Sequence, residues 1–393
     1  MRSDLRTAAT IATLALVAAA CEIERVEIPQ PPRGLALHGV LSATASTQAV
    51  LLERTRNGSV DYTGGILDPV DPIVSARGTA ESGATVRIVT PAGDTLLATE
   101  DADRLGDGRG SGVYRFTLPG AALQRAAAYD LAIVTRTGET LTARTSVPGG
   151  NPAMTATQRV FDRASDTVYV QWPAVSGARA YFVRIESPYG PRTFFTESAT
   201  LRLTGTLRNP DATGLPRMFL PGFLQSVTVS AVDANYYDWY RTHNNSVTGE
   251  GLINRVRGGI GVFGSVVRLT YERWDVTAPQ TDPESGTFDF DGSAFDRAST
   301  PNLTLSLWVE SRSARSDQPD VISGRYYKRP VLGARGCQVC GLLGTVRDGH
   351  VTLALLEDWF AHDTADVFTG EIRGDTLIGN YRFTGPARFV RRK

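Results

Sequence analysis

The chain has 393 residues, and its 41 acidic side chains balance its 41 Lys and Arg side chains. This balance excludes the strong positive field of a nucleic-acid-binding surface, so we expect no nucleic acid partner. The length allows two or three domains with hydrophobic cores, whereas three cysteines are too few for a disulfide scaffold.

Residues 1–20 have the pattern of an export signal. Arg2 and Arg6 precede an apolar run over residues 7–17, and three alanines follow it. The run is shorter than the ~20 residues of a membrane-spanning helix. Cys21 comes next, in an order that resembles a bacterial lipobox and predicts acylation at this cysteine. Ordinary cleavage and a single spanning helix are the alternatives.

The next two segments indicate a tether and a first β-domain. Residues 21–34 are polar and proline-rich, which is typical of an extended lipid-anchored tether. Residues 35–148 contain short alternating runs separated by glycine turns. This spacing predicts an N-terminal β-sandwich. The proline and glycine residues of 148–152 then indicate a linker.

Residues 153–273 predict a second β-sandwich. Strand-like runs at 168–172 and 181–185 place Trp172 before Tyr181. This spacing resembles a fibronectin type III domain, in which a strand tryptophan and a later tyrosine pack between two sheets. Residues 227–232 predict a late strand, and 209–222 form a long insertion.

Residues 274–286 predict a second polar linker, and residues 286–393 predict a third, independently folding domain. Turns at 344–349 and 370–375 carry the Asp-Gly and Gly-Asp pairs of tight hairpins. Adjacent hairpins favour an antiparallel meander or a small β-barrel. The predicted fold class is therefore all-β: two tandem sandwiches followed by this C-terminal unit.

Gly259, Gly261 and Gly264 formally match the G-x-G-x-x-G pattern of dinucleotide sites. That chemistry requires a helix after the glycines, whereas residues 265–271 are strand-like. We therefore interpret these glycines as positions of close backbone packing or a bulge, and we expect no cofactor.

Cys337 and Cys340 form a C-x-x-C pair. A structural zinc needs four ligands, and His350 and His362 are poorly spaced to complete the set. In an oxidising compartment the pattern predicts a local disulfide, with free thiols and a metal site as alternatives.

Two groups of aspartates come near to the pattern of a calcium loop. We expect solvated loops or strand faces there, and no metal site, because the ligand spacing is incomplete. The groups are Asp101, Asp103 and Asp107, and Asp289, Asp291 and Asp296.

One dense aromatic run is the candidate binding site. Aromatic and arginine side chains are frequent in binding hot spots. The alternative is a sandwich core with an amphipathic edge, because aromatic residues are favoured in strands. The candidate residues are Tyr236, Tyr237, Trp239, Tyr240, Arg241 and His243.

Several short motifs together resemble the bacterial lipoprotein family catalogued as domain of unknown function 4249. They are Cys21 and the stretches 83–86, 112–114, 138–148 and 254–264. The resemblance covers about residues 21–270. It implies an envelope lipoprotein, often found near outer-membrane transport systems, and offers no catalytic residues.

We therefore expect an outer-membrane lipoprotein, on the periplasmic side or the cell surface, that binds an envelope protein or an extracellular ligand. No nucleophile elbow, phosphate-binding loop or H-E-x-x-H motif is present, so we do not expect an enzyme. Two alternatives remain: a glycan-active hydrolase that uses acidic loop residues, and a carrier of small apolar ligands in the C-terminal barrel.

Overall fold

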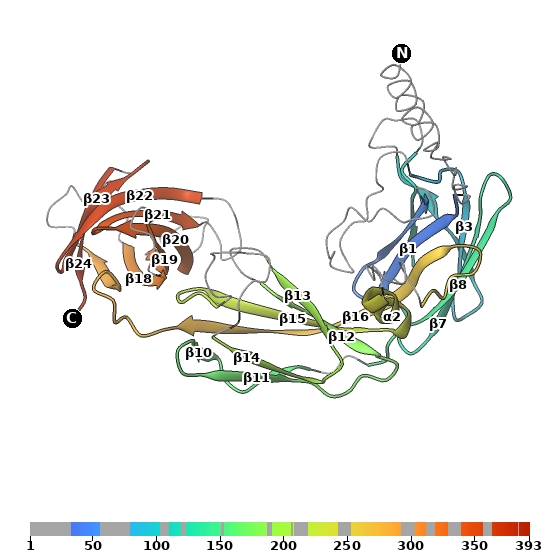
Figure 1. The fold of residues 1–393 in the computed structure, drawn as a ribbon, viewed down its shortest axis with the longest axis horizontal. Helices are drawn as coiled ribbons and strands as arrows, with labels where there is room; N and C mark the ends of the chain where they lie inside the picture. Colours follow the sequence, from blue (N-terminus) through green and yellow to red (C-terminus); the bar gives the residue numbers. More distant parts are fainter. Residues whose placement is uncertain are drawn as a thin grey trace, which may run out of the picture.

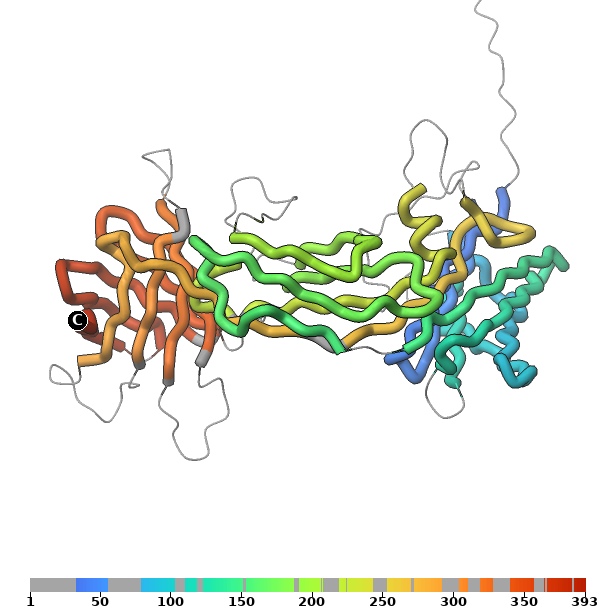
Figure 2. The backbone as a smooth tube through the Cα atoms, turned by 90° about the horizontal axis from the view of Figure 1, so that it is seen from below, coloured from blue at the N-terminus to red at the C-terminus, as the bar shows by residue number. Residues whose placement is uncertain are grey.

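The computed structural model is almost entirely β, as predicted, with three units in a row along its long axis (Figures 1 and 2). Cys21, His243 and Cys337 lie outside the described residues, and so do Asp103, Asp107 and Asp296. The structure describes residues 33–55, 79–102, 110–118, 123–150, 153–186, 191–205, 207, 219–242, 253–291, 303–311, 319–328, 339–356, 364–383 and 385–393. Among these residues, no helix is long and apolar enough to cross a membrane.

The first unit packs two sheets face to face. One sheet has the order β4-β3-β7-β8, and the other has the order β5-β6-β2-β1 and continues into β16. Strand β7 shows why these sequences form strands, because alternate side chains are buried at Tyr129, Leu131 and Ile133. The strands are β1 (Leu35–Ser42), β2 (Thr47–Arg54), β3 (Thr85–Val89), β4 (Thr95–Leu97), β5 (Thr99–Glu100), β6 (Val113–Thr117), β7 (Ala128–Val134) and β8 (Thr140–Ser146).

The second unit packs the sheet β14-β11-β9 on the strands β13-β12-β15-β16. Trp172 and Tyr181 pack edge to face, with ring centroids 5.1 Å apart, as their spacing predicts. The elements are β9 (Thr155–Ala156), β10 (Val160–Asp162), β11 (Thr167–Gln171), β12 (Ala180–Ile185), β13 (Arg192–Thr196), β14 (Thr200–Thr204), β15 (Leu224–Val232), α2 (Ala234–Thr242) and β16 (Ile260–Thr277).

Strand β16 belongs to both sandwiches. Its first residues pair in parallel with β1, from Ile260 to Val266, and its later residues pair antiparallel with β15, from Val266 to Asp275. One cluster of buried apolar side chains runs through both units. The linker predicted at 148–152 is therefore not a complete boundary between the two sandwiches, because β16, which follows it in the chain, belongs to both.

The third unit is a closed antiparallel barrel, β17 to β24 in chain order. Its predicted hairpins are confirmed: Asp348 and Gly349 have positive φ between β20 and β21, and Gly374 has positive φ between β22 and β23. The strands are β17 (Gly286–Phe290), β18 (Leu303–Ser311), β19 (Asp320–Lys328), β20 (Val339–Arg347), β21 (His350–Leu356), β22 (Thr364–Arg373), β23 (Thr376–Tyr381) and β24 (Gly385–Arg391).

Aromatic rings occupy the barrel interior. Phe368 packs against Tyr381 and Phe389, with centroids 5.0 and 5.8 Å away, and Phe288 is fully buried. Cys340 is buried in the same core and is disulfide-bonded. Its pairing with Cys337 stays a prediction. This filled interior favours a packed module over a carrier of apolar ligands.

The outer wall of the barrel packs against the second sandwich. Leu220 and Phe223 lie in a buried cluster with Leu343 and Leu356 of the barrel. The Ser323 hydroxyl donates to the Pro221 carbonyl at 3.1 Å. The end of the predicted 209–222 insertion is thus a contact between the two units.

The segment that enters the barrel is bonded to it as well. The Trp308 indole donates to the Ala278 carbonyl at 2.8 Å, and the Arg391 guanidinium donates to the Pro283 carbonyl at 2.7 Å. A Gly349 amide bonds to the Glu284 carboxylate at 2.9 Å. Residues 278–285 therefore belong structurally to the barrel.

We expect a fragment of residues 278–393 to fold cooperatively, because the barrel is closed and has its own core. A fragment of residues 286–393 should melt at least about 5 °C lower, because it lacks several hydrogen bonds of roughly 1 kcal/mol each. Circular dichroism and thermal melts of both fragments measure this. A disordered spectrum for residues 278–393 would show that the sandwich contact completes the barrel.

Candidate functional site

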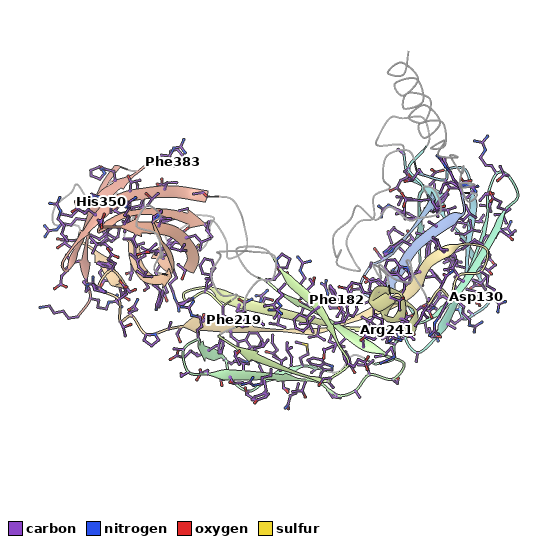
Figure 3. All side chains as sticks on the ribbon, in the orientation of Figure 1. Asp130, Phe182, Phe219, Arg241, His350 and Phe383 are labelled. Atoms are coloured by element: carbon purple, nitrogen blue, oxygen red, sulfur yellow. The ribbon has the colours of Figure 1, made fainter. Side chains whose placement is uncertain are left out.

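The candidate aromatic residues lie on helix α2, not on a strand. Asp233 follows β15 and caps the helix, with its carboxylate accepting the Tyr236 amide at 3.0 Å. Tyr236 and Trp239 follow at the i, i+3 spacing of one helix face, and both are buried. Figure 3 shows Arg241 of this helix beside Phe182, at the junction of the two sandwiches, and Asp130 on the first sandwich beyond it.

Two of the predicted binding residues form the base of the helix. Tyr236 and Trp239 are 4% and 8% exposed, and they pack on Val40, Phe182 and neighbouring apolar residues of the sheet. For these two rings the alternative interpretation, a core role, is confirmed, although the element is a helix. Sequence reasoning missed the helix because it weighed the β-propensity of aromatic residues above the Asp233 cap.

His38 of β1 lies under the helix. Its ring is edge-on to Trp239, with centroids 5.6 Å apart, and edge-on to Tyr236 at 6.4 Å. Burial lowers the pKa of His38 to about 4, so the imidazole is neutral near pH 7. A neutral imidazole enclosed by aromatic rings is placed as a core side chain.

The other side of the helix presents a mixed aromatic and arginine surface, which we call the α2 patch: Arg179, Phe195, Tyr237, Tyr240 and Arg241. Two guanidinium groups lie over the Tyr237 ring, that of Arg179 at 5.3 Å and that of Arg241 at 5.9 Å. The rings of Phe195 and Tyr240 pack with centroids 4.3 Å apart. Tyr237 and Tyr240 are half-buried, so part of each side chain remains exposed to solvent.

An ion pair orders the edge of this patch. Glu197 pairs with Arg179 at 2.9 Å and accepts the Tyr237 hydroxyl at 3.0 Å. Partial burial, and then this hydrogen bond to a carboxylate, raise the pKa of Tyr237. The Tyr237 hydroxyl is thus held as a neutral donor.

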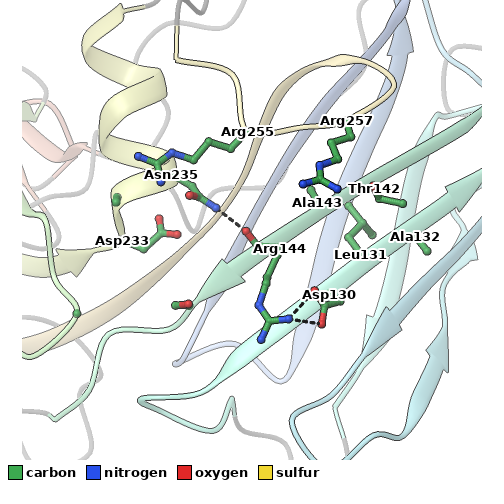
Figure 4. Close-up of a pocket in the computed structure, with 13 residues that line it drawn as sticks. Asp130, Leu131, Ala132, Thr142, Ala143, Arg144, Asp233, Asn235, Arg255 and Arg257 are labelled. Atoms are coloured by element: carbon green, nitrogen blue, oxygen red, sulfur yellow. Dashed lines mark hydrogen bonds and ion pairs between the residues drawn. The ribbon is translucent and has the colours of Figure 1, made fainter.

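An open groove of about 650 Å³ lies next to the helix N-terminus (Figure 4). It is bounded by β7 and β8, by Asp233 and Asn235, and by a segment that carries Arg255 and Arg257. Arg144 pairs with Asp130 at 3.1 Å on the groove wall. Sequence reasoning did not identify this groove, because its residues come from three distant segments.

A hydroxyl pair holds Asp233 between the two sandwiches. The Thr145 hydroxyl of β8 donates to the Asp233 carboxylate at 2.7 Å and lies 3.0 Å from the Ser265 hydroxyl of β16. Ser265 in turn lies 3.1 Å from the Ser146 carbonyl. Burial raises the pKa of Asp233 to about 6, although its hydrogen bonds oppose the shift.

The glycine motif of β16 serves close packing, as interpreted from the sequence. Gly261 has φ +117°, and a Cβ there would overlap the Leu37 carbonyl of β1. A Cβ on Gly264 would lie 2.7 Å from the Tyr236 Cβ, so this glycine lets the helix approach the strand.

The acidic groups are engaged by arginines where the structure describes them. Asp101 pairs with Arg115 at 2.7 Å, and Asp289 pairs with Arg392 at 2.6 Å. Within the described ranges, no group of three His, Cys, Asp or Glu side chains could hold a metal ion.

We predict opposite pH dependences for the two buried titratable groups. The pKa of Asp233 is raised to about 6, so its contribution to stability is present below its unfolded pKa and is lost as the pH rises through 6. The pKa of His38 is lowered to about 4, so its contribution is present above its unfolded pKa and is lost as the pH falls through 4. Between these values the two contributions offset each other.

Single variants should therefore reveal the two slopes. Between about pH 4.5 and 6, the unfolding free energy of Asp233→Asn should rise with pH relative to wild type, by up to ~1.4 kcal/mol per pH unit. That of His38→Gln should fall by a similar amount. Urea unfolding at several pH values measures both, and the double variant, as a control, should parallel wild type. If the unfolding free energies of both single variants change with pH as that of the wild type does, the shifted pKa values of Asp233 and His38 would be contradicted.

Comparison with known proteins gives weak matches to solved structures and one match to a protein family. Two solved structures resemble the chain only weakly. The first is a tetra-tandem repeat in the extending region of a large adhesion protein, with 11% identity and a TM-score of 0.19, and the match covers 91% of this chain and 72% of that one. The second is a Ca2+-stabilized adhesin that helps an Antarctic bacterium bind ice, with 14% identity and a TM-score of 0.17, and the match covers 91% of this chain and 90% of that one. Scores this low do not indicate a shared fold. No curated protein matches the chain.

The family model described as Domain of unknown function (DUF4249) matches residues 23–271. This match includes the α2 patch and the groove, and it ends inside β16, so the barrel lies beyond it. Because it covers more than half of the 393 residues, the chain belongs to the DUF4249 family.

Proposed function

We propose that the protein is a lipid-anchored component of a bacterial envelope that acts by binding a partner, as an accessory of an outer-membrane transport system. The α2 patch carries this proposal. It combines half-buried tyrosines of helix α2 with the exposed Arg179 and Arg241, and such side chains dominate binding hot spots.

The patch is suited to binding because its base is rigid. Tyr236 and Trp239 fix the helix on the sheet, and Asp233 fixes its first turn. Tyr237 and Tyr240 therefore lose little conformational freedom when a partner covers them, which lowers the entropic cost of association. The contacts of Arg179 and Arg241 with Tyr237 further limit their motion.

The lipid anchor supports the location, because the export pattern ends at Cys21. The proline-rich residues 21–34 would separate the first sandwich from the membrane. A surface held near a membrane in this way meets other membrane components at high effective concentration.

We predict that Cys21→Ser releases the protein from the membrane fraction. Acyl chains on Cys21 supply the anchor in this proposal, and stable anchoring needs two or more chains. Fractionation with a salt wash, followed by immunoblotting, measures the distribution. Continued sedimentation of Cys21→Ser with membranes would contradict the lipoprotein assignment.

We predict that the double variant Tyr237→Ala, Tyr240→Ala keeps the fold and weakens partner capture from envelope extracts, by about 2 kcal/mol or more. Trp239→Ala is the contrasting variant, because a buried tryptophan costs about 3–5 kcal/mol of stability when truncated. Thermal melts run beside pull-downs separate the two effects. A folded double variant that captures every wild-type partner equally well would remove the α2 patch as the contact.

A further inference from the structure

The groove beside α2 has features of an anion-binding site that the α2 patch does not share. Figure 4 shows Arg255 and Arg257 on one segment along the groove, and Arg144 with Asp130 on the strands opposite. The three guanidinium groups come from positions that the fold holds in place, and they line a space of about 650 Å³ that is open to solvent. This volume is in the range of small-molecule sites.

The segment that carries Arg255 and Arg257 is fixed at both ends. The Asn254 side chain accepts the Val256 amide at 3.1 Å and donates to the Gly259 carbonyl at 2.8 Å. Val256 is 7% exposed and packs in the sandwich core. Its inward position leaves its two arginine neighbours exposed.

Arg257 is also held by its backbone. Its amide donates to the Thr142 carbonyl at 2.9 Å, and the Thr142 amide donates to the Arg257 carbonyl at 3.0 Å. The Arg257 guanidinium has no acidic partner among the residues that the structure describes. The Arg257 backbone is therefore fixed on the groove wall, and no carboxylate of the described residues neutralises its exposed guanidinium.

The other arginines are only partly neutralised. Asp238 is shared, pairing with Arg255 at 2.7 Å and with Arg241 at 3.0 Å. One carboxylate thus serves two guanidinium groups. Arg255 uses one Nη group in its pair with the buried Asp238, and the rest of its half-exposed guanidinium remains open to an incoming anion.

A backbone donor points to the same place. In an antiparallel hairpin, hydrogen-bonded pairs alternate with pairs that are not hydrogen-bonded. The Thr135 amide donates to the Glu139 carbonyl in the β7–β8 hairpin, so the alternation makes Asp130 and Arg144 a pair that is not hydrogen-bonded. The Arg144 amide and carbonyl therefore point away from β7. The Arg144 carbonyl accepts the Asn235 side chain at 2.6 Å. In the described part of the chain, no acceptor is found for the Arg144 amide.

We propose that this groove binds the oxyanion group of a ligand, a carboxylate, phosphate or sulfate, at the Arg257 guanidinium, with Arg255 and Arg144 lining the same groove. Planar guanidinium groups donate two parallel hydrogen bonds to such groups, and charge-assisted bonds are the stronger kind. This inference adds a ligand chemistry to the proposed binding function, and it depends on residues outside the α2 patch.

Isothermal titration of the purified protein with acetate, inorganic phosphate and sulfate, at constant ionic strength, tests it. We expect saturable binding of at least one of them, weakened about tenfold or more in Arg257→Gln. The matched control is Arg202→Gln, an exposed arginine on β14 of the other sheet, which should bind like wild type. Thermal melts confirm that both variants fold, and the relative affinities distinguish a carboxylate from a phosphate or sulfate ligand.

Two results would overturn the inference: no saturable binding of any of the three anions, or an equal loss in Arg257→Gln and Arg202→Gln. The double variant Tyr237→Ala, Tyr240→Ala separates this inference from the proposed function, because it should retain anion binding. If the wild-type protein captures a partner through the α2 patch but binds no anion, only the inference about the groove is wrong. If it binds an anion but captures no partner, only the assignment of the α2 patch is wrong.

Discussion

The shared strand β16 is the constraint on which the sandwich architecture depends. One strand of 18 residues pairs with β1 along its first part and with β15 along its later part. Its two edges are thus used by different sandwiches, with overlap at Val266. Because a paired strand resists bending, the first two units are joined by a continuous hydrogen-bonded element as well as by the 148–152 linker.

This strand also explains why the candidate sites lie where they do. Strand β15 ends at Val232, which pairs with Val266, so the β16 residues before Val266 are not paired with β15. Helix α2, which Asp233 caps, lies beside this part of β16. Gly264 lets the helix approach closely. The helix covers apolar residues of both sandwiches, and the groove forms where its N-terminus meets β8.

Polar side chains at this corner are satisfied by residues from distant segments. Asp233 bonds to Thr145, and Asn235 bonds to the Arg144 and Phe263 carbonyls. These bonds connect α2 to β8 and β16, so they depend on both sandwiches being in place. Buried hydrogen bonds of this kind favour one geometry, because a displaced helix would leave the Asp233 carboxylate unsatisfied.

The barrel is joined to the second sandwich by a different kind of contact. Gly222 has φ +86°, and a Cβ there would lie 2.6 Å from the Gly324 carbonyl carbon. The close approach lets Phe223 pack against β20 beside Gly341. The barrel therefore meets the sandwich through a small apolar cluster and a few hydrogen bonds, without a shared strand.

The sequence by itself determined the local features of this protein. Alternation of apolar residues predicted the strands, the Asp348 and Gly349 pair predicted a hairpin, and short motifs predicted the family. Each of these depends on neighbours in the chain. Tertiary structure decided the features that depend on distant residues: β16 pairs with β1, more than 200 positions earlier, and with β15, about 35 to 50 positions earlier. The groove combines Asp130, Arg144 and Asp233 with Arg255 and Arg257 for the same reason, since no local pattern records which strand edges meet in space.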